Sequence, residues 1–346
     1  MGFRRYVIGR AIDSIILLII TIIFNFILFR VMPGDPTTAI LGRAGSPVHD
    51  PGEYRSRLVE RFGLNKAVLP FIDKDFQLTF DPNTLFDNQF VVYVQKLLVG
   101  DLGISFNYFP QEVSYLIFGH RLLNTIILMG LSILLSFLLA ILLGTLASSK
   151  FKSKTDLTLI FVTLTSYSTP VFWIGMLIVF VFFGQLGVLP YGGSPRIEEY
   201  PDIIQWALDY LYHMIGPLVT LTISFVGAWF LIARDQMLGV FTEDYITTAR
   251  AKGLPERRVM FVHARKNAML PMISVLALAM TYLVSGATIT ETVFNWNGLG
   301  LLTYESVYRQ DYPVLQGLLL LVAAVAIISN FIADLIYGLL DPRIRY

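Results

Sequence analysis

The chain has 346 residues, of which 55% are hydrophobic and 15% charged, and its formal net charge is +1. This composition is too apolar for an ordinary soluble domain, so we expect much of the chain to lie in lipid. The net charge points to no class of partner, and we expect no nucleic acid. The absence of cysteine excludes disulfides, thiolate metal sites and cysteine nucleophiles.

Apolar runs along the chain predict an all-α integral membrane protein with six transmembrane helices. A spanning helix needs about 20 mainly apolar residues to cross a hydrocarbon core of roughly 30 Å. The runs that meet this length are residues 12–31, 122–147, 157–183, 215–233, 272–293 and 314–340. The alternative for the first run is a cleaved signal peptide, which would need a core of about 7–15 residues and a small-residue cleavage site, whereas this run is longer and ends in Met32-Pro33-Gly34-Asp35-Pro36.

The distribution of Lys and Arg predicts that both termini are cytoplasmic, because cytoplasmic loops retain positive charge. With the N-terminus inside, the short outer loops hold only Arg196 and Arg309. The inner segments then hold Arg4, Arg5, Arg10, Lys150, Lys152, Lys154, Arg234, Arg250, Lys252, Arg257, Arg258, Arg265, Lys266, Arg343 and Arg345.

These spans divide the chain into four parts. The predicted parts are a cytoplasmic N-terminus with the first transmembrane helix (1–31), an extracytoplasmic segment (32–121), a core of five transmembrane helices (122–340) and a cytoplasmic tail (341–346).

The long segment between the first two spans is the main hydrophilic stretch. Residues 54–63 and 90–98 have apolar side chains three or four apart and predict short helices, whereas residues 71–80 indicate a strand. The segment is either a lid or spacer, or a docking surface for an external partner.

The inner loop of residues 234–271 holds seven basic residues. Asp244 can cap a short helix that ends at Gly253, where glycine can adopt the left-handed conformation. Pro255 suits the first position of a second short helix, which would end before Pro271. Two short helices meeting at a Gly-Leu-Pro corner would form a protruding knob that a soluble motor could grip. The alternative is a basic loop held by anionic lipid headgroups.

The sequence of this loop resembles binding-protein-dependent ABC permeases, and within them the first permease of dipeptide, oligopeptide and nickel importers. The loop reads Thr248-Ala249-Arg250-Ala251-Lys252-Gly253-Leu254-Pro255-Glu256-Arg257-Arg258, followed by His263-Ala264, Asn267-Ala268 and Leu270-Pro271. Further matches are Pro33-Gly34-Asp35-Pro36, Gly100-Asp101-Leu102-Gly103-Ile104-Ser105, Pro170-Val171-Phe172-Trp173-Ile174-Gly175, Glu291-Thr292-Val293-Phe294, Gly298-Leu299-Gly300, Asp311-Tyr312-Pro313 and Leu340-Asp341-Pro342-Arg343-Ile344-Arg345.

The resemblance implies a type I ABC importer permease fold in the cell membrane of a prokaryote. The expected partners are a homologous second permease, two ATPase subunits that bind ATP and Mg, and an extracytoplasmic substrate-binding protein. No cofactor, metal site or catalytic residue is expected in this chain, which also lacks a Gly-x-x-x-x-Gly-Lys-Ser/Thr phosphate loop. The resemblance implies a coupling helix that contacts one ATPase through Tyr245, Thr248, Ala249, Arg250, Ala251, Lys252, Gly253, Leu254, Pro255, Glu256, Arg257 and Arg258.

Two departures from the family pattern stand out. Thr247-Thr248-Ala249 replaces the Glu-Ala-Ala of the general permease signature, which fits the peptide subfamily. Residues 69–88 resemble an insertion whose role the sequence does not define.

Two other classes of protein are weaker interpretations. An intramembrane hydrolase needs convergent catalytic residues at membrane depth, and the chain has no His-Glu-x-x-His motif and no histidine central to a span. A channel or secondary carrier predicts more intramembrane polar residues. The resemblance favours oligopeptides as substrates, with oligosaccharides or nickel chelates as alternatives, and it identifies no residue of the substrate pathway.

Overall fold

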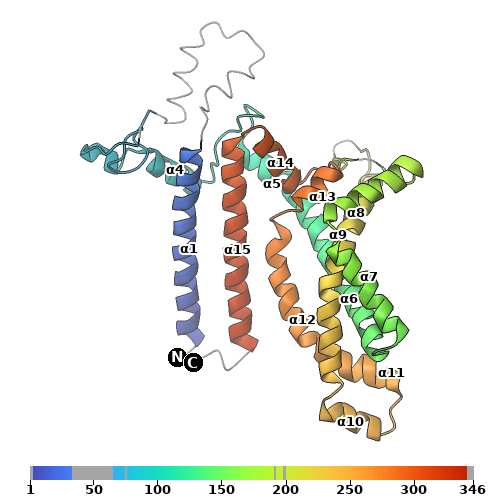
Figure 1. Ribbon diagram of the computed structural model, residues 1–346. Coiled ribbons are helices and arrows are strands. Elements are labelled where there is room, and N and C mark those ends of the chain that lie inside the picture. The colour runs from blue at the N-terminus through green and yellow to red at the C-terminus, as the bar shows by residue number, and fades with distance from the viewer. Residues whose placement is uncertain (1–2, 33–64, 75, 191, 198–199, 341–346) are drawn as a thin grey trace. The chain divides into compact units, whose positions relative to one another are not determined.

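The computed structural model describes residues 3–32, 65–74, 76–190, 192–197 and 200–340, and this part of the chain is predominantly helical (Figure 1). Among these residues there is no continuous strand, only isolated β-bridges. The chain forms two compact units. Unit 1 comprises residues 1–121, 302–331 and 338–346, and unit 2 comprises residues 122–301 and 332–337.

Two long apolar helices belong mainly to unit 1, namely α1 (Phe3–Val31) and α15 (Tyr312–Leu340). Near its Val31 end, α1 packs against the short helix α4 (Gln89–Leu98) and against α15 (Figure 1). Phe26 is buried and its ring centroid lies 5.2 Å from that of Phe90, while the Asn25 amide donates a 3.0 Å hydrogen bond to the Gln316 carbonyl. Between Ile15 and Leu28 the rest of the surface of α1 is mainly apolar and exposed, as expected for a helix in lipid.

A buried carboxylate joins two distant motifs within unit 1. Asp311 precedes α15 and is fully buried. It accepts hydrogen bonds from the Ser105 hydroxyl and from the backbone N–H groups of Phe106 and Asn107, the latter at 3.0 and 2.9 Å. These bonds join the motif at residues 311–313 to the end of the motif at residues 100–105 and the two residues after it, and they satisfy the buried carboxylate.

The segment between α1 and the next span is only partly as predicted. The helix expected at residues 90–98 is present as α4, capped by the Asn88 side chain. The strand expected at residues 71–80 is wrong, because Ile72 forms isolated bridges with Leu69 and Leu78 and the chain then turns into a 3-10 helix at Pro82–Leu85. The predicted helix at 54–63, the motif at 33–36 and the tail at 341–346 lie outside the described residues.

Unit 2 packs five helices closely. They are α6 (His120–Ser149), α7 (Lys154–Ser168), α8 (Val171–Ile178), α9 (Ile203–Val240) and α12 (Arg265–Ala279). Its buried core includes Phe137 and Trp229, whose rings meet edge to face at 5.6 Å. A Cβ atom on Gly144 would lie 2.7 Å from Ala233 Cβ, so glycine permits the close approach of α6 and α9.

Two of the predicted spans are not continuous helices. The run at 157–183 is bent by 96° between α7 and α8, where Pro170 lacks an N–H and keeps Thr169 in the extended region. The run at 272–293 breaks after α12 into a 3-10 turn, a left-handed Gly286 (φ +76°) and the short helix α13 (Thr288–Val293).

The other four predicted spans are long apolar helices. The described residues contain four helices long and apolar enough to cross a membrane, or five if the bent pair counts as one span. The predicted count of six is therefore not confirmed, whereas the all-α, multi-spanning architecture is.

Candidate functional site

The loop between α9 and α12 begins with the helix α10 (Asp244–Ala251). Ile246 and Ala249, three residues apart, turn to one face of α10 and are buried. They pack with Met237 of α9 and with Val259, Ala264 and Ala268 after the corner. Complete burial of a side chain such as Ile246 contributes about 1.5–3 kcal/mol, so this small core holds α10 firmly against α9 and α12.

The corner of the loop has the predicted glycine conformation. Gly253 has φ +75°, and the Gly253 N–H donates a 2.9 Å hydrogen bond to the Arg250 carbonyl. The predicted start of α10 is off by one residue, because Glu243 is the N-cap and Asp244 is already helical. Pro255 likewise stands just before the helix that starts at Glu256, α11 (Glu256–Arg258).

The second helix of the loop is not short. α11 continues through a π-helical turn, Val259–Ala264, into α12, so that Pro271 lies inside a helix rather than after one. Proline inside a helix costs one backbone hydrogen bond, which membrane helices tolerate. The corner is therefore connected to a long helix without an intervening loop.

An ion pair closes the corner of the loop. The Arg250 guanidinium donates hydrogen bonds of 3.2 and 2.6 Å to the two carboxylate oxygens of Glu256, and it lies 5.8 Å from the Phe241 ring. The hydrogen bonds from Arg250 hold the pKa of Glu256 below its ordinary value. Both side chains are exposed, so the pair orients the corner more than it stabilises it.

The structure separates the predicted contact residues into two groups. Ala249 is buried and Leu254 is half-buried in the core beneath α10, so the side chains of these two support the loop from within. The other ten are all exposed, and they are Tyr245, Thr248, Arg250, Ala251, Lys252, Gly253, Pro255, Glu256, Arg257 and Arg258.

A second polar centre in unit 2 was missed by sequence reasoning. The Glu291 carboxylate is fully buried and accepts hydrogen bonds from the Thr125 hydroxyl (2.9 Å) and the Leu301 N–H (3.0 Å). Side chains at Gly298 or Gly300 would collide with it, which explains the Gly-x-Gly spacing. The carboxylate caps the start of α14 (Leu299–Tyr308). The only indication of this centre in the sequence was the family motif at residues 291–294, which contains Glu291.

Unit 2 also holds a large cavity of about 690 Å³. Aromatic and apolar side chains from α6, α7, α9 and α12 line it, including Tyr167, Phe225 and Trp229. None of its lining residues carries a formal charge, so the cavity can accept neutral or apolar groups of many shapes. No group of three or more His, Asp or Glu side chains in the described residues could hold a metal ion.

These features define a multi-spanning membrane protein whose most elaborate polar structure is a loop with a buried apolar underside. The model of the family "binding-protein-dependent transport system inner membrane component" matches residues 137–346, and the chain belongs to this family. The family has the type I ABC permease fold, as predicted. Its members are transport permeases rather than enzymes.

Curated relatives match the chain over nearly its whole length. It is 32% identical over 341 residues to the oligopeptide transport system permease protein AppB of Bacillus subtilis (strain 168), covering 99% of both chains. It is 33% identical over 342 residues to the dipeptide transport system permease protein DppB of Escherichia coli (strain K12), covering 94% of both. The di/tripeptide transport system permease protein DppB of Pseudomonas aeruginosa (strain UCBPP-PA14) is 33% identical over 340 residues, again with 94% of both chains covered.

Proposed function

We propose that the chain is the permease subunit of an ATP-driven importer of oligopeptides and forms half of its translocation path. The names of the full-length relatives support peptides as the substrate class. In this proposal the chain pairs with a homologous second permease, two ATPase subunits that hold ATP and Mg, and an extracytoplasmic substrate-binding protein. The distribution of Lys and Arg supports cytoplasmic termini.

The observation that carries the proposal is the construction of the α9–α12 loop. The exposed residues between Tyr245 and Arg258 act as the coupling helix, seated on one ATPase subunit. Its buried face shares a core with Met237 of α9 and Ala268 of α12, so a displacement of α10 moves both helices. An ATPase subunit can shift the permease between two conformations only if it binds one of them more tightly than the other. The element that it contacts must therefore move as a rigid body and not deform.

We further assign the uncharged cavity of unit 2 to the translocation path. Peptides differ widely in side-chain charge and size, and a lining of aromatic and apolar groups imposes little charge selection. Ala228 lines the cavity, so Ala228→Trp should obstruct it and slow transport while leaving assembly intact. The matched control is Leu17→Trp on the exposed face of α1. Equal transport rates for Ala228→Trp and Leu17→Trp would show that the cavity is not part of the translocation path.

The proposal is tested by the ATPase activity of the four-subunit complex in liposomes, with its binding protein loaded in turn with peptides and with oligosaccharides. Stimulation by peptide-loaded protein alone is expected. Stimulation of ATPase activity only by the oligosaccharide-loaded binding protein would contradict peptides as the substrate class, but it would still support an ATP-driven importer. Failure of any ATPase subunit to co-purify with the permease would overturn the importer itself.

A further inference from the structure

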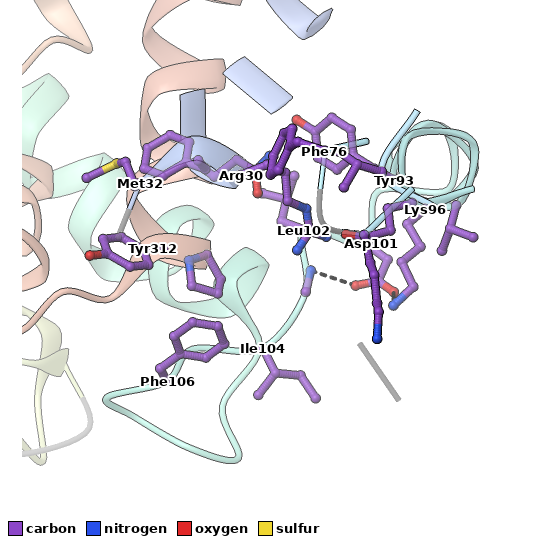
Figure 2. A pocket seen from close by; sticks show the side chains of 18 residues that line it. Arg30, Met32, Phe76, Tyr93, Lys96, Asp101, Leu102, Ile104, Phe106 and Tyr312 are labelled. Carbon is purple, nitrogen blue, oxygen red and sulfur yellow. Dashed lines mark hydrogen bonds and ion pairs between the residues drawn. The ribbon is translucent and has the colours of Figure 1, made fainter. Parts of the chain in front are cut away.

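A pocket of about 300 Å³ lies in unit 1 at the Val31 end of α1, and no part of the proposed transport mechanism uses it (Figure 2). The last turn of α1, the segment around Phe76, α4 and the start of α15 form its walls. Arg30, Tyr93, Phe106 and Tyr312 come from four different parts of the chain and gather around it (Figure 2). The pocket is therefore a product of the fold of unit 1.

The pocket has an excess of positive charge. Its lining includes three cations, Arg30, Lys74 and Lys96, and one carboxylate, Asp101. Lys96 Nζ lies 3.8 Å from Asp101 Oδ2, while Asp101 Oδ1 accepts a 2.8 Å hydrogen bond from the Gly103 N–H (Figure 2). No carboxylate of the described residues pairs with Arg30 or Lys74, and the Arg30 guanidinium lies 5.4 Å over the Phe26 ring. Within the part of the chain that the structure describes, two cations of the pocket therefore have no carboxylate partner and can face an anionic ligand.

The surroundings of the pocket are apolar on the side of α1. Along the preceding two turns of α1, Phe24 and Ile27 are exposed, and Phe24 is 64% exposed. Leu78 and Phe80, which follow the Phe76 segment, are 80% and 90% exposed. Aromatic and apolar side chains beside basic residues at the end of a span are typical of the membrane–water interface.

We propose that this pocket binds the phosphate headgroup of an anionic glycerophospholipid in the leaflet at the Val31 end of α1. The planar Arg30 guanidinium can donate two parallel hydrogen bonds to a phosphate diester, and Lys74 supplies a second, mobile charge. The acyl chains then lie along the exposed apolar face of α1. Inorganic phosphate shares the headgroup chemistry, but it would make no use of that apolar face.

A tryptophan at position 76 reports lipid occupancy locally, because Phe76 lines the pocket and the four native tryptophans all lie in unit 2. The full-length Phe76→Trp protein is reconstituted in phosphatidylcholine with small fractions of brominated phosphatidylglycerol or brominated phosphatidylcholine, and the signal of the protein without this tryptophan is subtracted. Quenching by the brominated phosphatidylglycerol should reach half its maximum at a mole fraction roughly 25-fold lower than quenching by the brominated phosphatidylcholine, about five-fold for each of the two cations. Lys74→Gln in this background should reduce the preference about five-fold, and adding Arg30→Gln should abolish it.

The control Lys150→Gln with Lys154→Gln removes two positive charges from unit 2, where Lys150 follows α6 and Lys154 begins α7, and should leave the preference intact. Lys74 is exposed, and no hydrogen bond or ion pair joins its side chain to another of the described residues, so the single variant tests the site even if Arg30→Gln fails to fold. Equal quenching by both lipids, or a preference that survives Lys74→Gln with Arg30→Gln, would overturn the proposal. Loss of the preference in inorganic phosphate at constant ionic strength would assign the pocket to free phosphate instead of lipid.

Discussion

The Arg234 guanidinium holds the Asp156 carboxylate through two parallel hydrogen bonds, Nε to Oδ1 and Nη2 to Oδ2, each 2.8 Å long. Asp156 is 1% exposed, and the Lys152 N–H donates a third hydrogen bond to it at 3.0 Å. The pair joins the first turn of α7 to α9 ten residues before α10 begins. The pair therefore holds in place the end of α9 from which the α9–α12 loop begins. We propose above that this loop contacts the ATPase.

Asp156→Ala should destabilise the protein by about 2 kcal/mol, because it leaves the mostly buried Arg234 guanidinium with only the exposed Asp235 beside it. Arg234→Lys keeps the positive charge but cannot form the bidentate hydrogen bonds, so it should destabilise the protein less than Asp156→Ala does. Thermal unfolding of the purified protein in detergent measures both. Asp235→Asn is the control, since Asp235 is 74% exposed and 3.7 Å from Arg234, and it should cost less than about 1 kcal/mol. An Asp156→Ala protein as stable as the control would show that the pair is unimportant.

Gly298→Ala should destabilise the protein by about 1–3 kcal/mol or more, because the added methyl overlaps the Glu291 carboxylate and the Thr125 hydroxyl, which is 2.5 Å from the ideal Cβ position. Both of those groups are fully buried and cannot turn to water. The comparison is Gly130→Ala in α6, where the nearest atom is 3.7 Å away. This second change should be neutral or slightly stabilising, since alanine favours helix. Similar unfolding temperatures for the two variants would contradict the packing described around Glu291.

Gly253→Val should weaken coupling between ATP hydrolysis and transport, because a β-branched residue is strained at φ +75°. No atom lies within 4 Å of a Cβ placed there, so the effect arises from the backbone alone. The measurement is the number of ATP molecules hydrolysed per substrate transported by the reconstituted complex. Gly239→Ala in α9 also has open space around it, at a position that is not left-handed, and should leave this ratio unchanged. An unchanged ratio for Gly253→Val would refute the role of the corner.

The Arg250–Glu256 pair should make the loop sensitive to acid. Its hydrogen bonds lower the pKa of Glu256 in the folded loop, so its stabilising effect is complete above the ordinary pKa of 4.5 and is lost as the pH falls through the lowered value. Because both side chains are exposed, the effect is under about 1 kcal/mol.

At neutral pH the amides of α10 should exchange with solvent more slowly in the wild type than in Glu256→Gln. This difference should shrink below pH 4.5 and vanish once the carboxyl group is protonated. High salt should reduce the difference at neutral pH as well. If the difference in amide exchange between the wild type and Glu256→Gln grew as the pH fell, the Arg250–Glu256 pair would not be its cause.

Local patterns predicted much of the architecture. The runs at 12–31, 122–147, 215–233 and 314–340 all fall within long helices, because uninterrupted apolar sequence has only one stable form in lipid. The glycine corner at Gly253 was also predictable, since its conformation depends on its immediate neighbours. The breaks at Pro170 and Gly286 were visible in the sequence, but hydrophobicity alone does not distinguish a broken span from a continuous one.

The polar centres could not have been found from local sequence. Glu291 meets Thr125, and Asp156 meets Arg234, across 166 and 78 residues respectively. Such pairs depend on which helix faces are adjacent, and spacing along one helix carries no information about this. Ala249 illustrates the same limit, because the motif that contains it does not indicate which of its side chains turns inward.

The carboxylate of Asp311 has a consequence for the order in which the protein is made. Its partner Phe106 is synthesised 205 residues earlier, and at about 5–20 residues per second the interval is roughly 10–40 s. During that time the N–H groups of Phe106 and Asn107 lack their acceptor, so the segment before α6 cannot reach its final structure until Asp311, just before α15, has been made. A polypeptide truncated before Asp311 would keep its early spans but carry an unfinished surface that quality-control proteases can recognise.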